Sequence, residues 1–170
     1  KKACESLSGL EEAHVGKVCK AIANGALFGA RGNSGVILSQ WWRGFAEALE
    51  NHSEFDAQLF AQACRNAVER AYKAVIKPVE GTILTVTRQA MEAVIEQART
   101  ETDLRTLFQT KVQAAYNSLS HTPDLLPVLR DAGVVDSGGQ GWTFMIDGML
   151  RLMRGEDIPL TSVISTQERQ

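Results

Sequence analysis

Apolar residues recur every three or four positions along most of this chain, which is the period of an α-helix. The first apolar stripe occupies positions 10–26, and the second occupies positions 36–49. Between them stand small and polar residues, and a helix beginning near Asn33 or Ser34 accounts for the second stripe. Two successive amphipathic helices are therefore predicted in the first fifty residues.

The middle of the chain continues the same pattern. Ser53, with Asp56 three residues later, resembles a capping box and predicts the start of a long helix that continues through Val75. Pro78 ends that helix, because proline cannot donate the backbone hydrogen bond that an interior position needs. Positions 82–99 are again apolar at helical spacing.

The last third predicts three more helices. Thr102 is a candidate cap for a helix through Leu119, and Thr122 followed by Pro123 predicts a short helix through Leu129. The final helix follows a glycine-rich loop at Gly138 or Gly139, continues through Leu152 and ends before Gly155.

No segment shows the alternation typical of a strand. The pattern predicts an all-α domain of about seven helices over residues 1–157, with a tail or linker at residues 158–170.

Composition narrows the class of protein without identifying it. The 170 residues fit one domain, and a net charge of −2 with no basic run argues against nucleic-acid binding. The longest apolar stretches are far shorter than the roughly 20 residues that span a bilayer, so no transmembrane segment is predicted. Three cysteines with no CxxC pair favour free thiols in a reducing cytoplasm over disulfides or a structural zinc site.

The glycines concentrate at three junctions where a loop meets a helix. These junctions lie at residues 29–35, at Gly81 and at residues 133–141, and each also carries short polar side chains. The first residues of a helix expose unpaired backbone N–H groups at the positive end of its dipole, which suits an anion. Three such junctions at one end of a helical domain would form a rim of donors suited to a polyphosphate.

The first junction, GARGNSG, has the composition of a phosphate cradle. Its glycines allow close backbone approach, and its Asn and Ser side chains add hydrogen-bond donors. It lacks the lysine and the spacing of a Walker A loop, and it follows no strand. The alternative is a tight turn between two helices in which Asn33 or Ser34 is simply an N-cap.

The other two junctions are open to the same two interpretations. GTILTVT, at residues 81–87, places Thr82 at the start of an apolar helix, where it can be an ordinary cap. DAGVVDSGGQG, at residues 131–141, can be a connecting turn in which Asp131 or Asp136 accepts backbone N–H groups.

Three stretches in this order carry a resemblance to a known family: ALFGARGNSGVILSQWWRGFAEAL, GTILTVTRQAMEA and PDLLPVLRDAGVVDSGGQG. They resemble the amino-terminal kinase domain of the bacterial fatty acid kinase catalytic subunit. That group belongs to the DAK2 family and is similar to the nucleotide-binding L domain of dihydroxyacetone kinase. The resemblance covers roughly residues 10–157.

The resemblance implies a helical barrel or bundle that binds ATP and Mg²⁺ at one end. In that picture one loop–helix junction holds the phosphates, a second helix start contributes a threonine, and the aspartate loop closes the nucleotide site. The residues implied in nucleotide binding are Gly32, Asn33, Ser34, Gly35, Thr82, Asp136, Gly138 and Gly139.

One part of the family pattern is missing. The family holds its magnesium with a cluster of aspartates, whereas the aspartates of this chain are isolated in sequence. We expect that cluster upstream of Lys1, so that this chain is a piece of a longer protein and lacks the first helices of the barrel. Phosphoryl transfer relies on metal ions to neutralise charge, and little kinase activity is expected from these residues alone.

The implied function is transfer of the γ-phosphate of ATP to a fatty acid that a separate fatty-acid-binding protein presents, in the cytoplasm, with a homodimer possible. Two alternatives stay open. One is a subunit of a dihydroxyacetone-type kinase, and the other is a helical interaction domain that has lost catalysis.

Overall fold

The structure is a computed structural model that describes residues 1–10 and 13–157. These residues form nine helices and no strand, so the prediction of an all-α fold is confirmed. The predicted tail at 158–170 lies outside the described residues. The helices are α1 (Lys2–Glu5), α2 (Val15–Gly29), α3 (Gly32–Leu49), α4 (Ala57–Lys73), α5 (Ile83–Gln97), α6 (Leu104–Ser120), α7 (Thr122–Leu125), α8 (Pro127–Ala132) and α9 (Ser137–Met153).

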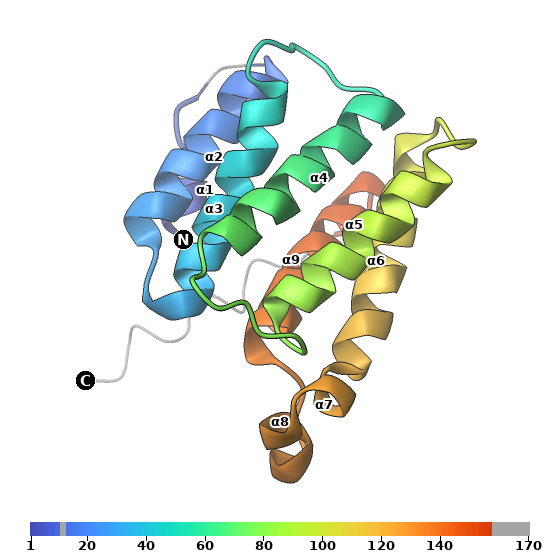
Figure 1. Cartoon of the computed structure of the whole chain (residues 1–170). Coiled ribbons are helices and arrows are strands. Elements are labelled where there is room, and N and C mark those ends of the chain that lie inside the picture. The colour runs from blue at the N-terminus through green and yellow to red at the C-terminus, as the bar shows by residue number, and fades with distance from the viewer. Residues whose placement is uncertain (11–12, 158–170) are drawn as a thin grey trace.

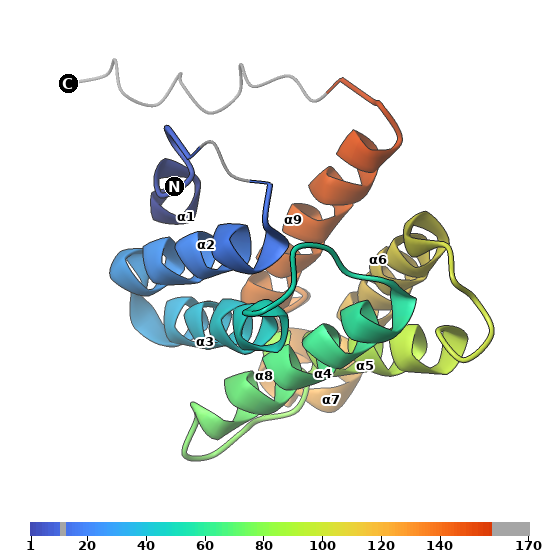
Figure 2. The same ribbon diagram turned by 90° about the horizontal axis from the view of Figure 1, so that it is seen from above.

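The long helices pack in chain order around a common core. Helix α2 packs on α3, α3 on α4, α4 on α5, α5 on α6, and α9 closes against both α5 and α6 (Figure 1). The short helix α1 lies against α2 (Figure 2), and the pair α7 and α8 forms an excursion at the lower end of Figure 1. Most connections are short, so the long helices that follow one another from α2 to α6 run in alternating directions, and their ends gather at the two ends of the bundle.

Two helices are absent from the sequence prediction. Helix α1 has only one turn, which is too short to show a hydrophobic period. The predicted helix from Thr122 to Leu129 is divided into α7 and α8 at Leu126, whose backbone is extended with φ −127° and ψ 101°. Pro127 imposes that conformation, because its ring disfavours α geometry in the residue before it.

Several predicted boundaries are wrong by a few residues. The first stripe becomes helical only at Val15, after an extended His14. The caps of α4 and α6 are Asp56 and Asp103 instead of Ser53 and Thr102: the Asp56 carboxylate accepts the Leu59 N–H at 2.8 Å, and Asp103 caps α6 in the same way. Helix α4 ends at Lys73, before Val75 and Pro78.

Aromatic side chains from four helices fill the centre of the fold. Trp41 stacks on Phe45 with ring centroids 5.4 Å apart, and its edge meets Trp142 of α9 at 5.7 Å. Phe60 of α4 contacts Phe45 and Phe108 of α6. Aromatic pairs at these separations contribute beyond the area they bury, and here they join α3, α4, α6 and α9.

A lysine lies inside this aromatic cluster. Lys111 is 2% exposed, and its Nζ lies 4.9 Å from the Trp41 ring centroid and within 5.7 Å of four further rings. Nζ also donates to Cys64 Sγ at 3.4 Å. Burial raises the pKa of the Cys64 thiol, and the opposing effect of Lys111 is smaller, so the sulfur is a neutral acceptor. The aromatic faces are therefore the main electrostatic partners of Lys111.

Glycine permits a close contact between the backbones of α3 and α4. A Cβ atom at Gly44 of α3 would lie 2.4 Å from the Asn66 carbonyl oxygen and 2.9 Å from Ala67 Cα, both in the backbone of α4. Gly148 of α9 is also inside a helix, but a Cβ there would meet nothing within 4 Å. At Gly44 a substitution therefore affects helix packing, whereas at Gly148 it affects only the conformational entropy of the backbone.

Substituting these glycines should change stability in opposite directions. We expect Gly44→Ala to lower the free energy of unfolding by about 1–3 kcal/mol, because the backbones must move apart. Gly148→Ala should raise it by about 0.5–1 kcal/mol by restricting the unfolded chain. Urea denaturation of both variants beside the parent measures the two changes, and a loss of stability in Gly148→Ala matching that of Gly44→Ala would contradict the assigned contact.

Candidate functional site

The three glycine-rich junctions meet at one end of the helical bundle. The turn before α3, the loop before α5 and the start of α9 all lie toward the lower end of Figure 1. Side chains from these segments line one pocket of about 450 Å³, to which the loop after α4 adds a wall. The convergence predicted from the sequence is therefore confirmed, and it brings Ser34, Thr82 and Asp136 into one lining.

The pocket is lined by both polar and apolar side chains. The polar lining consists of Asn33, Ser34, Lys77, Thr82 and Asp136. The apolar lining consists of Val36, Ile37, Ala74, Val75, Ile76, Val79, Ile83 and Leu84. Such a mixed lining suits a ligand that has a charged, strongly hydrated part and a flat or apolar part.

Gly138 brings the start of α9 close to the start of α3. A Cβ at position 138 would lie 3.0 Å from Ser34 Oγ and 3.3 Å from Asp136 Oδ2. Any larger residue would press on the Ser34 hydroxyl and on the capping carboxylate. Gly138, one of the residues implied in nucleotide binding, therefore has a steric role at the edge of the pocket.

Asn33 and Ser34 lie at the start of α3 but do not cap it. The helix begins at Gly32, whose φ is +62°, and its N-cap residue is Arg31, which makes no side-chain capping bond. The cap predicted at Asn33 or Ser34 is therefore wrong. Both side chains are exposed and, among the described residues, neither forms a hydrogen bond. The guanidinium of Arg31 turns back to the carbonyl of Ala30 at 2.7 Å.

The other two junctions use their polar side chains as caps. Thr82 is the N-cap of α5, and its hydroxyl donates to the Val79 carbonyl at 2.8 Å and accepts the Leu84 N–H at 3.4 Å. Asp136 is the N-cap of α9, and its Oδ2 accepts the Gly139 N–H at 2.7 Å. Both residues nevertheless line the pocket.

None of the four predicted glycines is among the residues that line the pocket, including Gly138, which lies beside two of those residues. Gly139 is buried, with Val86 and Leu119 against it, and its N–H is already engaged by Asp136. Gly35 faces Ala30, and Gly32 supplies the positive φ of the turn. These glycines shape the starts of α3 and α9. Their geometry does not support direct contact with a ligand in the pocket.

Sequence reasoning missed the wall that follows α4. The sequence predicts a helix that continues through Val75 and ends at Pro78, but Val75, Ile76, Lys77 and Val79 line the pocket. The signal that could have found them is the short segment between Pro78 and the cap at Thr82, which must turn sharply beside a predicted site. Lys77 adds the one cationic side chain of this lining.

No cluster of ligands suitable for a metal occurs in the described part of the chain. Asp136 is the one carboxylate of the pocket lining, and no group of three or more His, Cys, Asp or Glu side chains within residues 1–10 and 13–157 could hold an ion. A pair of Mg²⁺ ions needs several oxygen ligands. The residues present therefore do not fit the metal site that the sequence resemblance implies.

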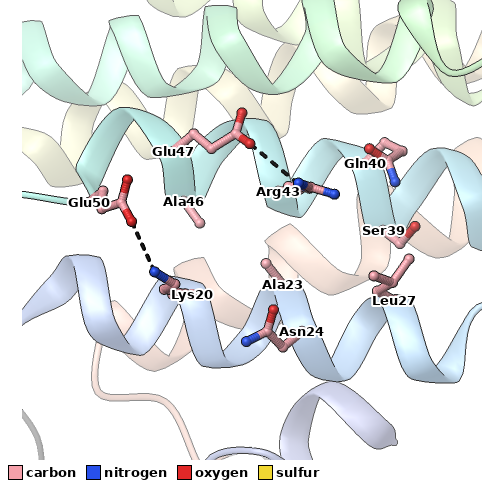
Figure 3. Close-up of a pocket in the computed structure, with 10 residues that line it drawn as sticks. All are labelled: Lys20, Ala23, Asn24, Leu27, Ser39, Gln40, Arg43, Ala46, Glu47 and Glu50. Atoms are coloured by element: carbon pink, nitrogen blue, oxygen red, sulfur yellow. Dashed lines mark hydrogen bonds and ion pairs between the residues drawn. The ribbon is translucent and has the colours of Figure 1, made fainter.

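Another hollow, of about 320 Å³, lies between α2 and α3 (Figure 3). Its floor is made of small or apolar side chains, and its rim carries ion pairs such as Lys20 with Glu50 at 2.9 Å and Arg43 with Glu47 at 3.3 Å. These side chains are about half exposed, so the pairs contribute little. The rim mixes both charges and holds none of the junction residues, and it does not favour an anion.

Comparison with known proteins assigns the family. The sequence model of the DAK2 domain matches residues 1–151. Protein YloV of Bacillus subtilis (strain 168) is 49% identical over 150 residues, which is 88% of this chain and 27% of that protein. An uncharacterized protein of Staphylococcus aureus (strain USA300) is 48% identical over 145 residues, 85% of this chain and 26% of that protein.

The chain belongs to the DAK2 domain family, which is associated with kinases related to the dihydroxyacetone kinase L domain. It spans about a quarter of the length of the relatives it matches. None of the helices within the described ranges is long and apolar enough to cross a membrane.

The turn at Gly81 sets the position of the α5 junction. Gly81 is buried with φ +79°, and a Cβ there would lie 2.8 Å from Leu126 Cβ and 2.9 Å from the Thr122 carbonyl oxygen. Gly133 has a similar φ of +66°, but a Cβ there would meet nothing. Both glycines allow a positive φ that other residues rarely adopt. Of the two, only Gly81 is also required by the close packing of neighbouring atoms.

Alanine at these two turns should separate the two constraints. Gly133→Ala should lower stability by about 1–2 kcal/mol, the cost of a left-handed non-glycine residue. Gly81→Ala should lose that amount plus about 1–3 kcal/mol for the collision with the α7 and α8 segment. Equal losses for the two variants in denaturant unfolding would show that the contact does not constrain the turn.

Proposed function

We propose that this chain is the ATP-binding part of a kinase that phosphorylates the carboxylate of a fatty acid presented by a separate fatty-acid-binding protein. In that reaction a carboxylate oxygen bonds to the γ-phosphorus of ATP, the bond from phosphorus to the β–γ bridging oxygen breaks, and ADP leaves. The product is an acyl phosphate. The observation that carries the proposal is the meeting of three long-helix N-termini at one half-polar pocket in a DAK2-family chain.

The polar residues of the pocket lining support the proposal that the phosphates of ATP bind here. The first turn of α3 has backbone N–H groups without a side-chain cap, and the side chains of Asn33 and Ser34 beside them are without hydrogen bonds among the described residues. Lys77, from the loop after α4, adds a positive charge to the same lining. The positive ends of the α3, α5 and α9 dipoles add to the attraction for an anion.

The apolar residues of the lining support the proposal that the adenine base of ATP binds in the same pocket. Val75, Val79 and Ile83 present branched side chains to the same pocket. A purine ring could bind against them while the phosphates remain at the helix starts, because polar and apolar residues line the same pocket. Positioning and neutralisation of charge are the principal tasks of a kinase active site.

Magnesium is part of the proposed reaction, but its ligands are not supplied by the residues described above. The proposal therefore requires aspartates outside these residues, as the family resemblance implies. A catalytically silent interaction domain is the second candidate, and the lack of a metal-ligand cluster in the described ranges favours it. A dihydroxyacetone-type kinase differs from the first proposal only in its acceptor.

Replacing Asn33 and Ser34 together by alanine tests the phosphate side of the pocket. Hydrogen bonds to a charged group are worth about 1.5–3 kcal/mol, so ATP affinity should fall at least about tenfold. Stability should change little, because neither side chain caps α3. Titration calorimetry with ATP measures the affinity, and thermal unfolding measures the stability.

Asp56→Ala is the matched control for that variant. It removes a cap at the opposite end of the bundle and should cost about 1 kcal/mol of stability while leaving ATP affinity unchanged. If the Asn33 and Ser34 variant binds ATP as the parent does, the phosphate assignment is refuted and the junction is only a turn between helices.

A second test concerns turnover by these 170 residues alone. Incubation with ATP, Mg²⁺, a fatty acid and its presenting protein should yield no acyl phosphate, and dihydroxyacetone in place of the fatty acid should yield no phosphorylated product. The missing metal ligands are the reason. Robust formation of either product would mean that residues of this chain do hold the metal ions, and it would overturn the requirement for further aspartates.

A further inference from the structure

A polar network outside the pocket holds the loop between α4 and α5. At its centre is Glu80, whose Oε2 accepts hydrogen bonds from Thr85 Oγ1 at 2.7 Å and from Arg88 Nη2 at 2.9 Å. Its Oε1 accepts the Tyr72 hydroxyl at 3.1 Å. One carboxylate therefore joins the last turn of α4 to the first turns of α5.

Thr85 connects this network to the backbone of the turn. Its hydroxyl oxygen accepts the Gly81 N–H at 2.8 Å while its proton goes to Glu80. Thr85 is fully buried, so the Gly81 N–H has no solvent to replace this acceptor. Losing it would leave a buried donor unsatisfied, which is more costly than losing an exposed hydrogen bond.

Tyr72 and Arg88 complete the network. Arg88 Nε donates to the Tyr72 hydroxyl at 3.1 Å, and its Nη1 pairs with Glu92 at 3.0 Å. Burial raises the pKa of Glu80, but the hydrogen bonds from Thr85 and Arg88 outweigh it and keep the pKa below its ordinary value of 4.5. The central acceptor is therefore ionised at neutral pH.

The network brackets one wall of the pocket. Residues 74–79 lie between Tyr72 and Glu80, and four of them contribute apolar lining while Lys77 contributes a cation. The start of the wall is fixed, because Val75 packs against the core and donates its N–H to the Tyr72 carbonyl at 3.2 Å. Beyond it the wall has few fixed points: Val79 accepts the Thr82 hydroxyl at its carbonyl, and Ile76 and Lys77 are exposed. The position of residues 76–79 therefore depends on the segments that flank them.

We propose that Glu80, Thr85, Arg88 and Tyr72 are positioning residues that fix the wall, together with the turn that follows it at residues 80–82, at the distance from α3 that the ligand requires. None of the four lines the pocket, so they act through the wall and through Thr82. The inference rests on the proposed function for the identity of the ligand, which is ATP. The anchoring of the wall is a property of the chain without ligand and can be measured separately.

The test compares three substitutions in the same helix. Thr85→Val keeps the shape of the buried side chain but removes the hydroxyl, whereas Thr85→Ser keeps the hydroxyl and should rescue the effect. Thr87→Val is the matched control, because Thr87 is also fully buried but donates only to the Leu84 carbonyl within its own helix, at 3.0 Å. Tyr72→Phe is a milder variant that removes one member of the network from a half-buried position.

Two measurements are made on each full-length variant of the chain. Hydrogen–deuterium exchange without ligand should accelerate at least about fivefold over residues 79–82 in Thr85→Val and to a smaller extent in Tyr72→Phe. ATP affinity by titration calorimetry should fall about three- to tenfold in Thr85→Val. Thr85→Ser and Thr87→Val should resemble the parent in both measurements.

The outcomes distinguish this inference from the proposed function. Unchanged exchange in both Thr85→Val and Tyr72→Phe overturns the anchoring, whatever the affinity. Faster exchange with parental ATP affinity overturns the positioning role and leaves the network purely structural. If the parent does not bind ATP, the proposed function and the ligand part of this inference both fail, while the exchange data still decide whether the network anchors the wall.

Discussion

The turn at Gly81 is the constraint on which the geometry of the pocket depends. Its positive φ turns the chain into α5, its N–H is bound by Thr85, and its missing Cβ leaves room for Leu126 and the Thr122 carbonyl. Thr122 in turn accepts the Asp136 N–H at 3.1 Å, at the residue that caps α9. One buried glycine thus relates the starts of two helices that are more than fifty residues apart in the sequence.

The helices themselves were predictable because burial imposes a period on them. The stripes that predicted six long helices correspond to α2–α6 and α9, and these supply nearly all of the buried apolar side chains. What could not be predicted was the choice of cap among several candidates. Asp56 and Asp103 prevail over Ser53 and Thr102 because each lies three residues before a free N–H once the helix is packed. That register is decided by tertiary contacts.

The candidate site was predictable only in part. Three of its four segments could be located from clustered glycines and short polar residues, because close backbone approach and helix capping require these residue types. The fourth segment, at residues 74–79, carries only Pro78 as a local mark, and its apolar side chains continue the helical pattern that precedes them. Its place in the pocket follows from the network around Glu80, in which Tyr72 and Arg88 meet across two helices, and such a meeting has no sequence signature.

The aromatic cluster around Lys111 has a consequence for spectroscopy. The chain has three tryptophans, and Trp41, Trp42 and Trp142 are all buried in that cluster, away from the pocket lining. Intrinsic fluorescence therefore reports the docking of α3 and α9 in the core. Ile37, one helical turn before Trp41, belongs to both the core and the pocket. A change in emission on adding a ligand would consequently mean that the ligand had moved α3 or α9, since filling the pocket alone touches no indole.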